Sequence, residues 1–159
     1  LYTPAAGYAG LDNFEYTCED NRGGTDSAQV TVDISNTNLP PLLSDLAKSG
    51  PVDAPITFSS NDFSAHFSDA NGDGLVKIQV TSLPANGLLQ LNGAAVTLNQ
   101  EITAANLGKL TFTPTSGWTG STSFQWNASD GLAYAATPAS VNIQITGGGY
   151  SIYLPVIQR

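Results

Sequence analysis

The chain has 159 residues, of which 13 are Asp or Glu and only 5 are Lys or Arg, so its formal net charge is -8. A surface this poor in bases argues against nucleic acid and anionic membranes as partners, because both are bound through clustered Lys and Arg. The single cysteine, Cys18, excludes an intramolecular disulfide, and no apolar run approaches the ~20 residues that a membrane-spanning helix needs.

The first 36 residues carry a pattern that returns 110 positions later. The matching pairs are Tyr2 and Phe112, Pro4 and Pro114, Gly7 and Gly117, Tyr8 and Trp118, Gly10 and Gly120, Phe14 and Phe124, Tyr16 and Trp126, Cys18 and Ala128, and Asp20 and Asp130. A period of this size is that of a domain. Residues 1–37 are therefore predicted to be the last third of an incomplete repeat, with three strands. Cys18 shares a strand face with Phe14 and Tyr16, which predicts a buried, unreactive thiol.

A short linker leads into one whole domain, expected over residues 38–146. Residues 36–41 are polar and end in Pro-Pro, which favours a stiff connection. Beyond them apolar residues alternate with period two, as in strands. Asn92-Gly93 predicts a type I′ hairpin turn, because both residues take positive φ there. Short strands separated by turns indicate an all-β, antiparallel Greek-key sandwich. The expected strands cover residues 56–59, 75–81, 88–91, 95–98, 109–113, 123–128 and 139–145, with a helical turn at 102–107.

The turn and strand sequences of this domain carry a family resemblance. Residues 112–131 have the pattern F-T-P-x-x-G-W-x-G-x-x-x-F-x-W-x-x-x-D-G, and an alternating Val-x-Ile-x-Ile strand follows at 141–145. Together with residues 67–75 and 83–91, they resemble bacterial cadherin-like and related immunoglobulin-like tandem repeats. The resemblance implies a secreted bacterial protein, extracellular or on the cell surface. Such repeats serve as stalks, adhesin shafts, spacers or accessory modules of secreted enzymes. It also implies junctions stiffened by calcium.

One loop of the domain has the oxygen spacing of a calcium loop. Asp69, Asn71 and Asp73 alternate along the chain, with a glycine at the sixth position, as in the first half of an EF-hand. Val80 stands where an EF-hand has its bidentate Glu, so a full EF-hand is excluded. In an immunoglobulin-like sandwich Asp130 lies at the same end, and these four oxygen-bearing side chains are the predicted site of a weakly bound calcium ion. The competing interpretation is that Asp, Asn and Gly only form turns here.

No set of residues predicts catalysis. His66 is the only histidine, and neither a metal centre nor a catalytic triad can be assembled around it. Trp118 and Tyr8 occupy matching turns where they could stack on a sugar, but their recurrence in both repeats favours packing over the sandwich end. Tyr134 and two tyrosines near the C-terminus are the loose candidates for glycan binding, although no strand carries a row of them.

Residues 147–159 combine a glycine linker with an apolar, β-prone tail. Its apolar side chains are Tyr150, Ile152, Tyr153, Leu154, Val156 and Ile157. Such a segment is not expected to stay free in water. Three roles are open: packing on its own domain, surface anchoring or sorting, and addition as a strand to another subunit. Pro155 lacks an N–H and limits such pairing to an edge or to one unpaired position.

These features predict a non-enzymatic extracellular module, structural or adhesive, in a surface stalk or filament. In one version, other copies of the chain are the partners, and the tail of one copy completes the incomplete domain of the next, which builds an open polymer. In a simpler version, residues 1–36 end a domain whose upstream part lies outside this sequence. The alternative function is an accessory carbohydrate-binding or spacer module of a secreted hydrolase, for which a glycan would be the partner.

Overall fold

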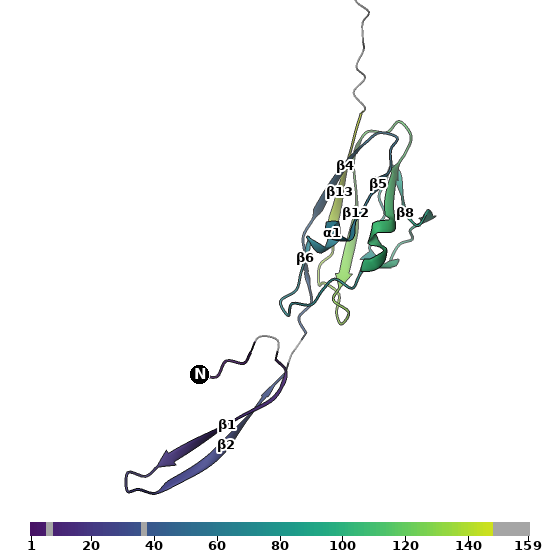
Figure 1. The fold of residues 1–159 in the computed structure, drawn as a ribbon. Helices are drawn as coiled ribbons and strands as arrows, with labels where there is room; N and C mark the ends of the chain where they lie inside the picture. Colours follow the sequence, from purple (N-terminus) through teal and green to yellow (C-terminus); the bar gives the residue numbers. More distant parts are fainter. Residues whose placement is uncertain (6–7, 36–37, 148–159) are drawn as a thin grey trace, which may run out of the picture. The chain divides into compact units, whose positions relative to one another are not determined.

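The computed structural model describes residues 1–5, 8–35 and 38–147, which form two compact units, Leu1–Asn38 and Leu39–Arg159 (Figure 1). Unit 1 is a hairpin of two antiparallel strands, β1 (Gly10–Glu19) and β2 (Thr25–Ile34). Asp20 closes its turn, because its Oδ1 accepts the backbone N–H groups of Arg22 at 2.8 Å and Gly24 at 2.9 Å. These bonds favour the ionised carboxylate and lower the pKa of Asp20.

The third strand expected in unit 1 is absent from the residues described there. Residues 1–5, which match the end of a strand in the second unit, have no strand conformation. A strand needs a neighbour to accept and donate its ladder hydrogen bonds, and none of the described residues of unit 1 provides one. The Tyr2 hydroxyl instead donates to the Asp12 carboxylate, which together with partial desolvation raises the pKa of Tyr2 to about 12.

Unit 2 is a sandwich of two main sheets, and the predicted all-β fold is confirmed. One sheet has the strand order β10-β7-β12-β13-β4 and the other β5-β11-β8-β9, while β3 and β6 form a small third pair. The elements are β3 (Leu42–Leu43), β4 (Leu46–Pro51), β5 (Ile56–Thr57), α1 (Ser60–Ser64), β6 (Phe67–Ser68), β7 (Lys77–Val80), β8 (Gly87–Leu91), β9 (Ala94–Ala95), β10 (Glu101–Thr103), a 3-10 helix (Ala104–Lys109), β11 (Leu110–Pro114), β12 (Gly120–Ser129) and β13 (Ala139–Thr146).

Local turn chemistry agrees with the sequence, whereas one strand pairing does not. Asn92 and Gly93 have φ of 52° and 80°, as a type I′ turn requires, and the expected helical turn is the 3-10 helix Ala104–Lys109. Strand β4, however, was not predicted, and it pairs with β13 in parallel rather than antiparallel. The parallel direction follows because the chain enters β4 at the end of the sheet where β13 begins, with Leu46 opposite Val141.

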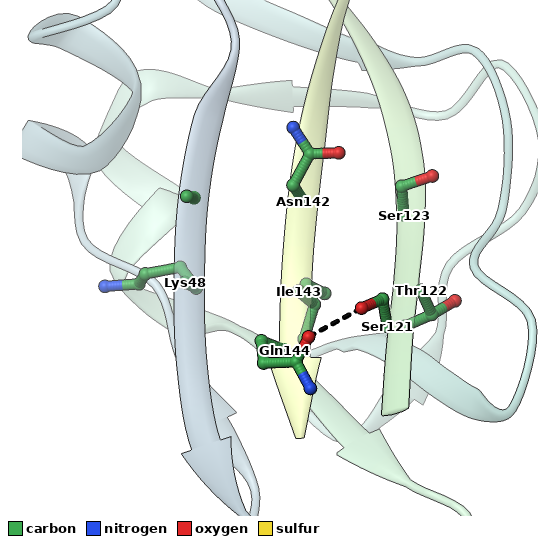
Figure 2. Close-up of a pocket in the computed structure, with 8 residues that line it drawn as sticks. Lys48, Ser121, Thr122, Ser123, Asn142, Ile143 and Gln144 are labelled. Carbon is green, nitrogen blue, oxygen red and sulfur yellow. Dashed lines mark hydrogen bonds between the residues drawn. The ribbon is translucent and has the colours of Figure 1, made fainter. Parts of the chain in front are cut away.

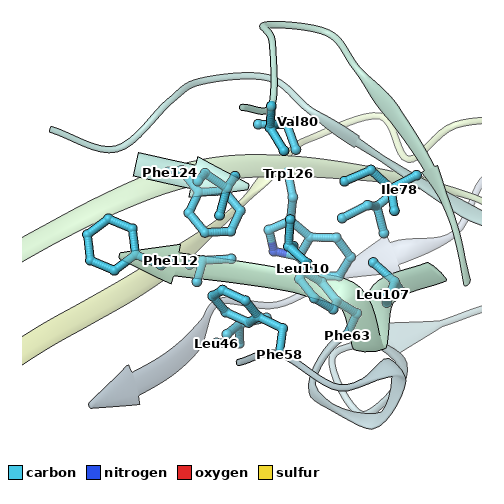
Figure 3. Close-up of a cluster of buried hydrophobic side chains, with 14 of the residues drawn as sticks. Leu46, Phe58, Phe63, Ile78, Val80, Leu107, Leu110, Phe112, Phe124 and Trp126 are labelled. Atoms are coloured by element: carbon cyan, nitrogen blue, oxygen red, sulfur yellow. The ribbon is translucent and has the colours of Figure 1, made fainter. Parts of the chain in front are cut away.

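The core lies between the two main sheets and is centred on aromatic rings (Figure 3). Phe124 and Trp126 of β12 point inward and are fully buried. Phe58 meets Phe124 edge-on with ring centroids 5.9 Å apart, and Phe63 meets Trp126 edge-on at 5.1 Å. Such edge-to-face pairs add directional attraction to the burial of apolar area. None of the helices in the described part of the chain is long and apolar enough to cross a membrane.

Candidate functional site

The predicted calcium ligands lie in two loops at one end of unit 2. Ser129, at the end of β12, pairs with Lys77, at the start of β7. The loop that precedes β7 and the loop that follows β12 are therefore at the same end of the sheet. The chain entering the domain is there too, since the Leu39 N–H donates to Asn71 Oδ1 at 2.7 Å.

Asp69 combines a turn-forming oxygen with a buried one. Its Oδ1 accepts the backbone N–H groups of Asn71 at 2.7 Å and Asp73 at 3.3 Å. Its Oδ2 is buried and has no hydrogen-bond partner among the residues described. A buried carboxylate oxygen without a donor is costly, and a hard cation is the type of partner that would satisfy it.

Asp130 is held mainly by backbone donors. Its side chain is only 8% exposed, and its Oδ1 accepts the N–H groups of Leu132 at 2.7 Å and Ala133 at 2.6 Å. Within the described ranges, no three His, Cys, Asp or Glu side chains come together in a metal-holding group. A calcium ion at this end would therefore also need amide, backbone or water oxygens, which calcium accepts readily. The residues fit such an ion through Asp69 Oδ2, and the four-residue site stays a prediction.

The aromatic residues singled out as sugar platforms have other contacts. Trp118 packs against the core, and a Cβ added at Gly120 would lie 3.1 Å from its Cζ2. Tyr8 stands over Gly10 in the same way, and the two glycines have φ of +135° and +133°. The same aromatic-over-glycine turn thus recurs in both units, and it fits the packing interpretation.

Tyr134 belongs to a surface cluster with Lys77 and Glu101. Its hydroxyl donates to Glu101 Oε1, and the Lys77 ammonium lies 5.4 Å from its ring centroid and 2.8 Å from Glu101 Oε2. Burial and the bond to Glu101 raise the pKa of Tyr134, and the bond from Lys77 lowers the pKa of Glu101. Because the ammonium lies over the ring, that face of Tyr134 is not open for sugar stacking.

His66 and the outer face of the larger sheet complete the search for reactive groups. His66 Nδ1 shares a hydrogen bond of 3.0 Å with Ser44 Oγ. A shallow groove over β4, β12 and β13 is lined mainly by small hydroxyl and amide side chains (Figure 2). Its only charged lining residue, Lys48, points away from Asn142 and Gln144, and its ammonium lies 2.8 Å from Asp62 Oδ2. The groove holds neither an aromatic platform nor a charged group directed into it.

The exposed apolar face of the hairpin was not anticipated. Cys18, predicted to be buried, is exposed, and Phe14 and Tyr16 beside it are each 46% exposed. The prediction failed because alternation fixes which residues share a face, whereas burial depends on what covers that face. The predicted tail residues, Tyr150, Ile152, Tyr153, Leu154, Val156 and Ile157, lie outside the described ranges.

Each of the two units matches the model of a known protein family. The model of the cadherin-like domain matches residues 37–146, and that of the bacterial Ig domain matches residues 1–33. Two solved structures, the endo-fucoidan hydrolase MfFcnA4 of glycoside hydrolase family 107 and a variant of it, each share 20% identity over 91% of this chain, with TM-scores of 0.38 and 0.42. The chain spans only 20% of the length of these hydrolases. No curated protein matches it.

Proposed function

The chain belongs to the cadherin-like domain family, and on that basis we propose that it is an extracellular structural or adhesive module in a bacterial surface stalk or filament. The observation that carries the proposal is the repeated closing hairpin. Phe14 opposes Val30 in unit 1 as Phe124 opposes Val141 in unit 2. Successive copies of one repeat along a chain are the architecture of a shaft. Domains of both matched families are typically non-catalytic and extracellular.

Immunogold labelling of intact cells with an antibody to residues 39–147 tests this role. Label on projections outside the cell supports the stalk. Label confined to the cytoplasm would remove the proposal. Brief protease treatment of intact cells is the matched control, because it should strip an external epitope and leave an internal one.

In the proposed stalk, calcium binds at the end of unit 2 that holds Asp69, Asn71, Asp73 and Asp130. The buried, unpartnered Asp69 Oδ2 supports this site. When bound, the ion supplies positive charge and oxygen coordination. Asp69 holds the turn through the N–H groups that its Oδ1 accepts from Asn71 and Asp73. Asn71 in turn accepts the N–H of Leu39, which connects the loop to the entering chain. An extracellular module of this type is expected to bind calcium with a Kd of about 10⁻⁴–10⁻³ M.

The polymeric form of the proposal assigns the tail, Tyr150 to Ile157, to strand addition on the hairpin of another copy. The outer edges of β1 and β2 support it as a receiving surface, because within the described residues of unit 1 neither edge pairs with a further strand. Deleting residues 148–159 should then convert large assemblies into monomers in sedimentation velocity. A chain that is monomeric with and without the tail rejects the polymer and leaves anchoring as the role of the tail.

The alternative function is an accessory carbohydrate-binding or spacer module of a secreted hydrolase. A ligand-binding experiment distinguishes the carbohydrate-binding role from the stalk. Of the described aromatic residues that the sequence singled out for sugar stacking, Trp118 and Tyr8 pack within their own turns, and Lys77 lies over the ring of Tyr134. A glycan retained on an array by the intact chain and lost with Tyr134→Ala would favour this alternative. The spacer version would instead place the chain beside a catalytic domain in one polypeptide.

A further inference from the structure

We infer that the apolar face of the β1–β2 hairpin is one half of a sandwich core, and that a β-sheet layer built like residues 39–111, carried ahead of Leu1 in the same polypeptide, covers it. This inference deepens the tandem-repeat role proposed above and rests on it. The acceptor face is the side of the hairpin that carries Phe14, Tyr16, Cys18, Ala28, Val30, Val32 and Ile34, together with Asp12 opposite Val32 and Asp26 opposite Cys18.

The register of the hairpin identifies its place in a domain. Phe14 opposes Val30, Tyr16 opposes Ala28 and Gly10 opposes Ile34. In β12–β13 the corresponding pairs are Phe124 with Val141, Trp126 with Ala139 and Gly120 with Ile145. Directly opposed residues of an antiparallel pair point to the same face. The acceptor face therefore corresponds in register to the face that β12 and β13 turn toward the core of unit 2.

Unit 2 also shows what such a face meets. Phe124 and Trp126 are fully buried, whereas their counterparts Phe14 and Tyr16 are each 46% exposed. The rings that cover Phe124 and Trp126, Phe58 and Phe63, come from the opposite side of the core rather than from the same sheet. A matching occupant must therefore bring aromatic side chains on a second layer.

The edges of the hairpin specify two further strands. In unit 2 the outer edge of β12 pairs antiparallel with β7, and the outer edge of β13 pairs parallel with β4. Among the described residues of unit 1, nothing pairs with the corresponding edges of β1 and β2. The occupant thus provides one antiparallel strand, one parallel strand and the opposing layer, which are the elements of residues 39–111. Because Tyr2 corresponds to Phe112, the counterparts of those residues fall directly ahead of Tyr2.

A chain extended with its own sequence tests the inference. A second copy of residues 39–111 is placed directly before Tyr2, and the rate of alkylation of Cys18 is measured. Cys18 is the only thiol of both chains, and its counterpart, Ala128, is fully buried. The extension should slow alkylation by at least about 100-fold, because a closed sandwich exposes its core only by opening. The matched control has Phe58→Asp and Phe63→Asp in the added copy alone, and in it Cys18 should react as in the original chain.

Three results decide between the occupants. Protection in the extended chain but not in its control supports the covering layer. If the original chain already protects Cys18 and loses this protection on deletion of residues 148–159, the tail is the occupant and the inference is overturned. If the extension leaves Cys18 reactive, the Tyr16→Trp variant, which restores the residue found at 126, is measured as well; reactivity in both overturns the inference. A cytoplasmic location in the labelling experiment would refute the stalk without changing any of these rates.

Discussion

Replacing Asp69 with asparagine tests the calcium site at the level of one atom. The Asn side-chain oxygen can still accept the N–H groups of Asn71 and Asp73, which Asp69 Oδ1 accepts in the structure. The substitution changes the buried Oδ2, which has no hydrogen-bond partner among the described residues, into an NH2 group that cannot bind a cation. Without calcium, one uncompensated group replaces another, and we expect the free energy of unfolding to change by less than about 1 kcal/mol.

Calcium should stabilise the wild-type protein more than the Asp69→Asn variant. With a Kd of about 10⁻⁴–10⁻³ M, 10 mM calcium stabilises the wild-type unit by about 1.4–2.7 kcal/mol. For a domain of about 110 residues this raises Tm by roughly 5–11 °C. Asp69→Asn should lose more than half of that rise.

Tryptophan fluorescence is the appropriate assay, because both tryptophans, Trp118 and Trp126, belong to unit 2. Melting curves are recorded in EDTA, in 10 mM calcium and in 10 mM magnesium. Asp53→Asn is the matched control: it removes a carboxylate that accepts the N–H of Gly117, near the start of β12 and away from the calcium loop. An identical Tm in EDTA and calcium, or a full calcium response in Asp69→Asn, would refute the reasoning.

Three further substitutions test the packing of unit 2. Phe63→Ala removes the ring packed edge-on against Trp126 and should lower the free energy of unfolding by about 3–5 kcal/mol in urea titrations. Asp62→Ala removes the capping box of α1 and the partner of Lys48, for an expected loss of about 1–2 kcal/mol. Burial raises the pKa of Asp62, but hydrogen bonds from Lys48 and Ser59 outweigh it and hold the pKa below its ordinary value. The stability that Asp62 contributes is therefore present above the unfolded pKa near 3.9 and is lost as pH falls through the folded pKa. Melting curves of wild type and variant at a series of pH values measure this loss. Gly120→Ala forces a side chain into a φ of +135° and should cost about 1–3 kcal/mol in the same titrations.

Two of these changes, Phe63→Ala and Gly120→Ala, have a control in the same chain. Phe14→Ala alters a ring that is 46% exposed in unit 1, so the unfolding of unit 2 should not respond. Gly108→Ala places a Cβ where nothing lies within 4 Å, so it should cost little. Equal losses in Gly108→Ala and Gly120→Ala would contradict the role of backbone conformation, and a large loss in Phe14→Ala would contradict the assignment of Phe14 to a separate unit.

The sequence predicted elements whose signal is local and missed those fixed by distant partners. Strands β12 and β13 follow from strict alternation, and the turn at Asn92 follows from its preference for positive φ. Strand β4 has the sequence LAKSGP, in which Lys, Gly and Pro disfavour strands; it forms because the exposed edge of β13 supplies a ladder. The third strand expected in unit 1 is missing for the converse reason, since residues 1–5 have suitable residues and no described neighbour.

The candidate site also combines features that the sequence predicts with features that depend on distant residues. The spacing of Asp69, Asn71 and Asp73 predicts a loop with converging oxygens, because turn geometry is local. The bond from Leu39 to Asn71 depends on how the entering chain crosses the loop, and the burial of Asp69 Oδ2 depends on the tertiary packing around it. No spacing rule contains that information.

Comparison of the two hairpins shows that strand pairing and burial of the apolar face have different requirements. Both have the same register, so the alternating sequence is sufficient to pair the strands. The contacts that bury Phe124 and Trp126 come from Phe58 and Phe63 across the core. A strand added beside β2 would extend the sheet sideways and leave Phe14 in water, whereas a covering layer would remove from water a side chain whose full burial is worth about 1.5–3 kcal/mol. Strand addition without protection of Cys18 would therefore identify an edge partner, and the core face would still need its layer.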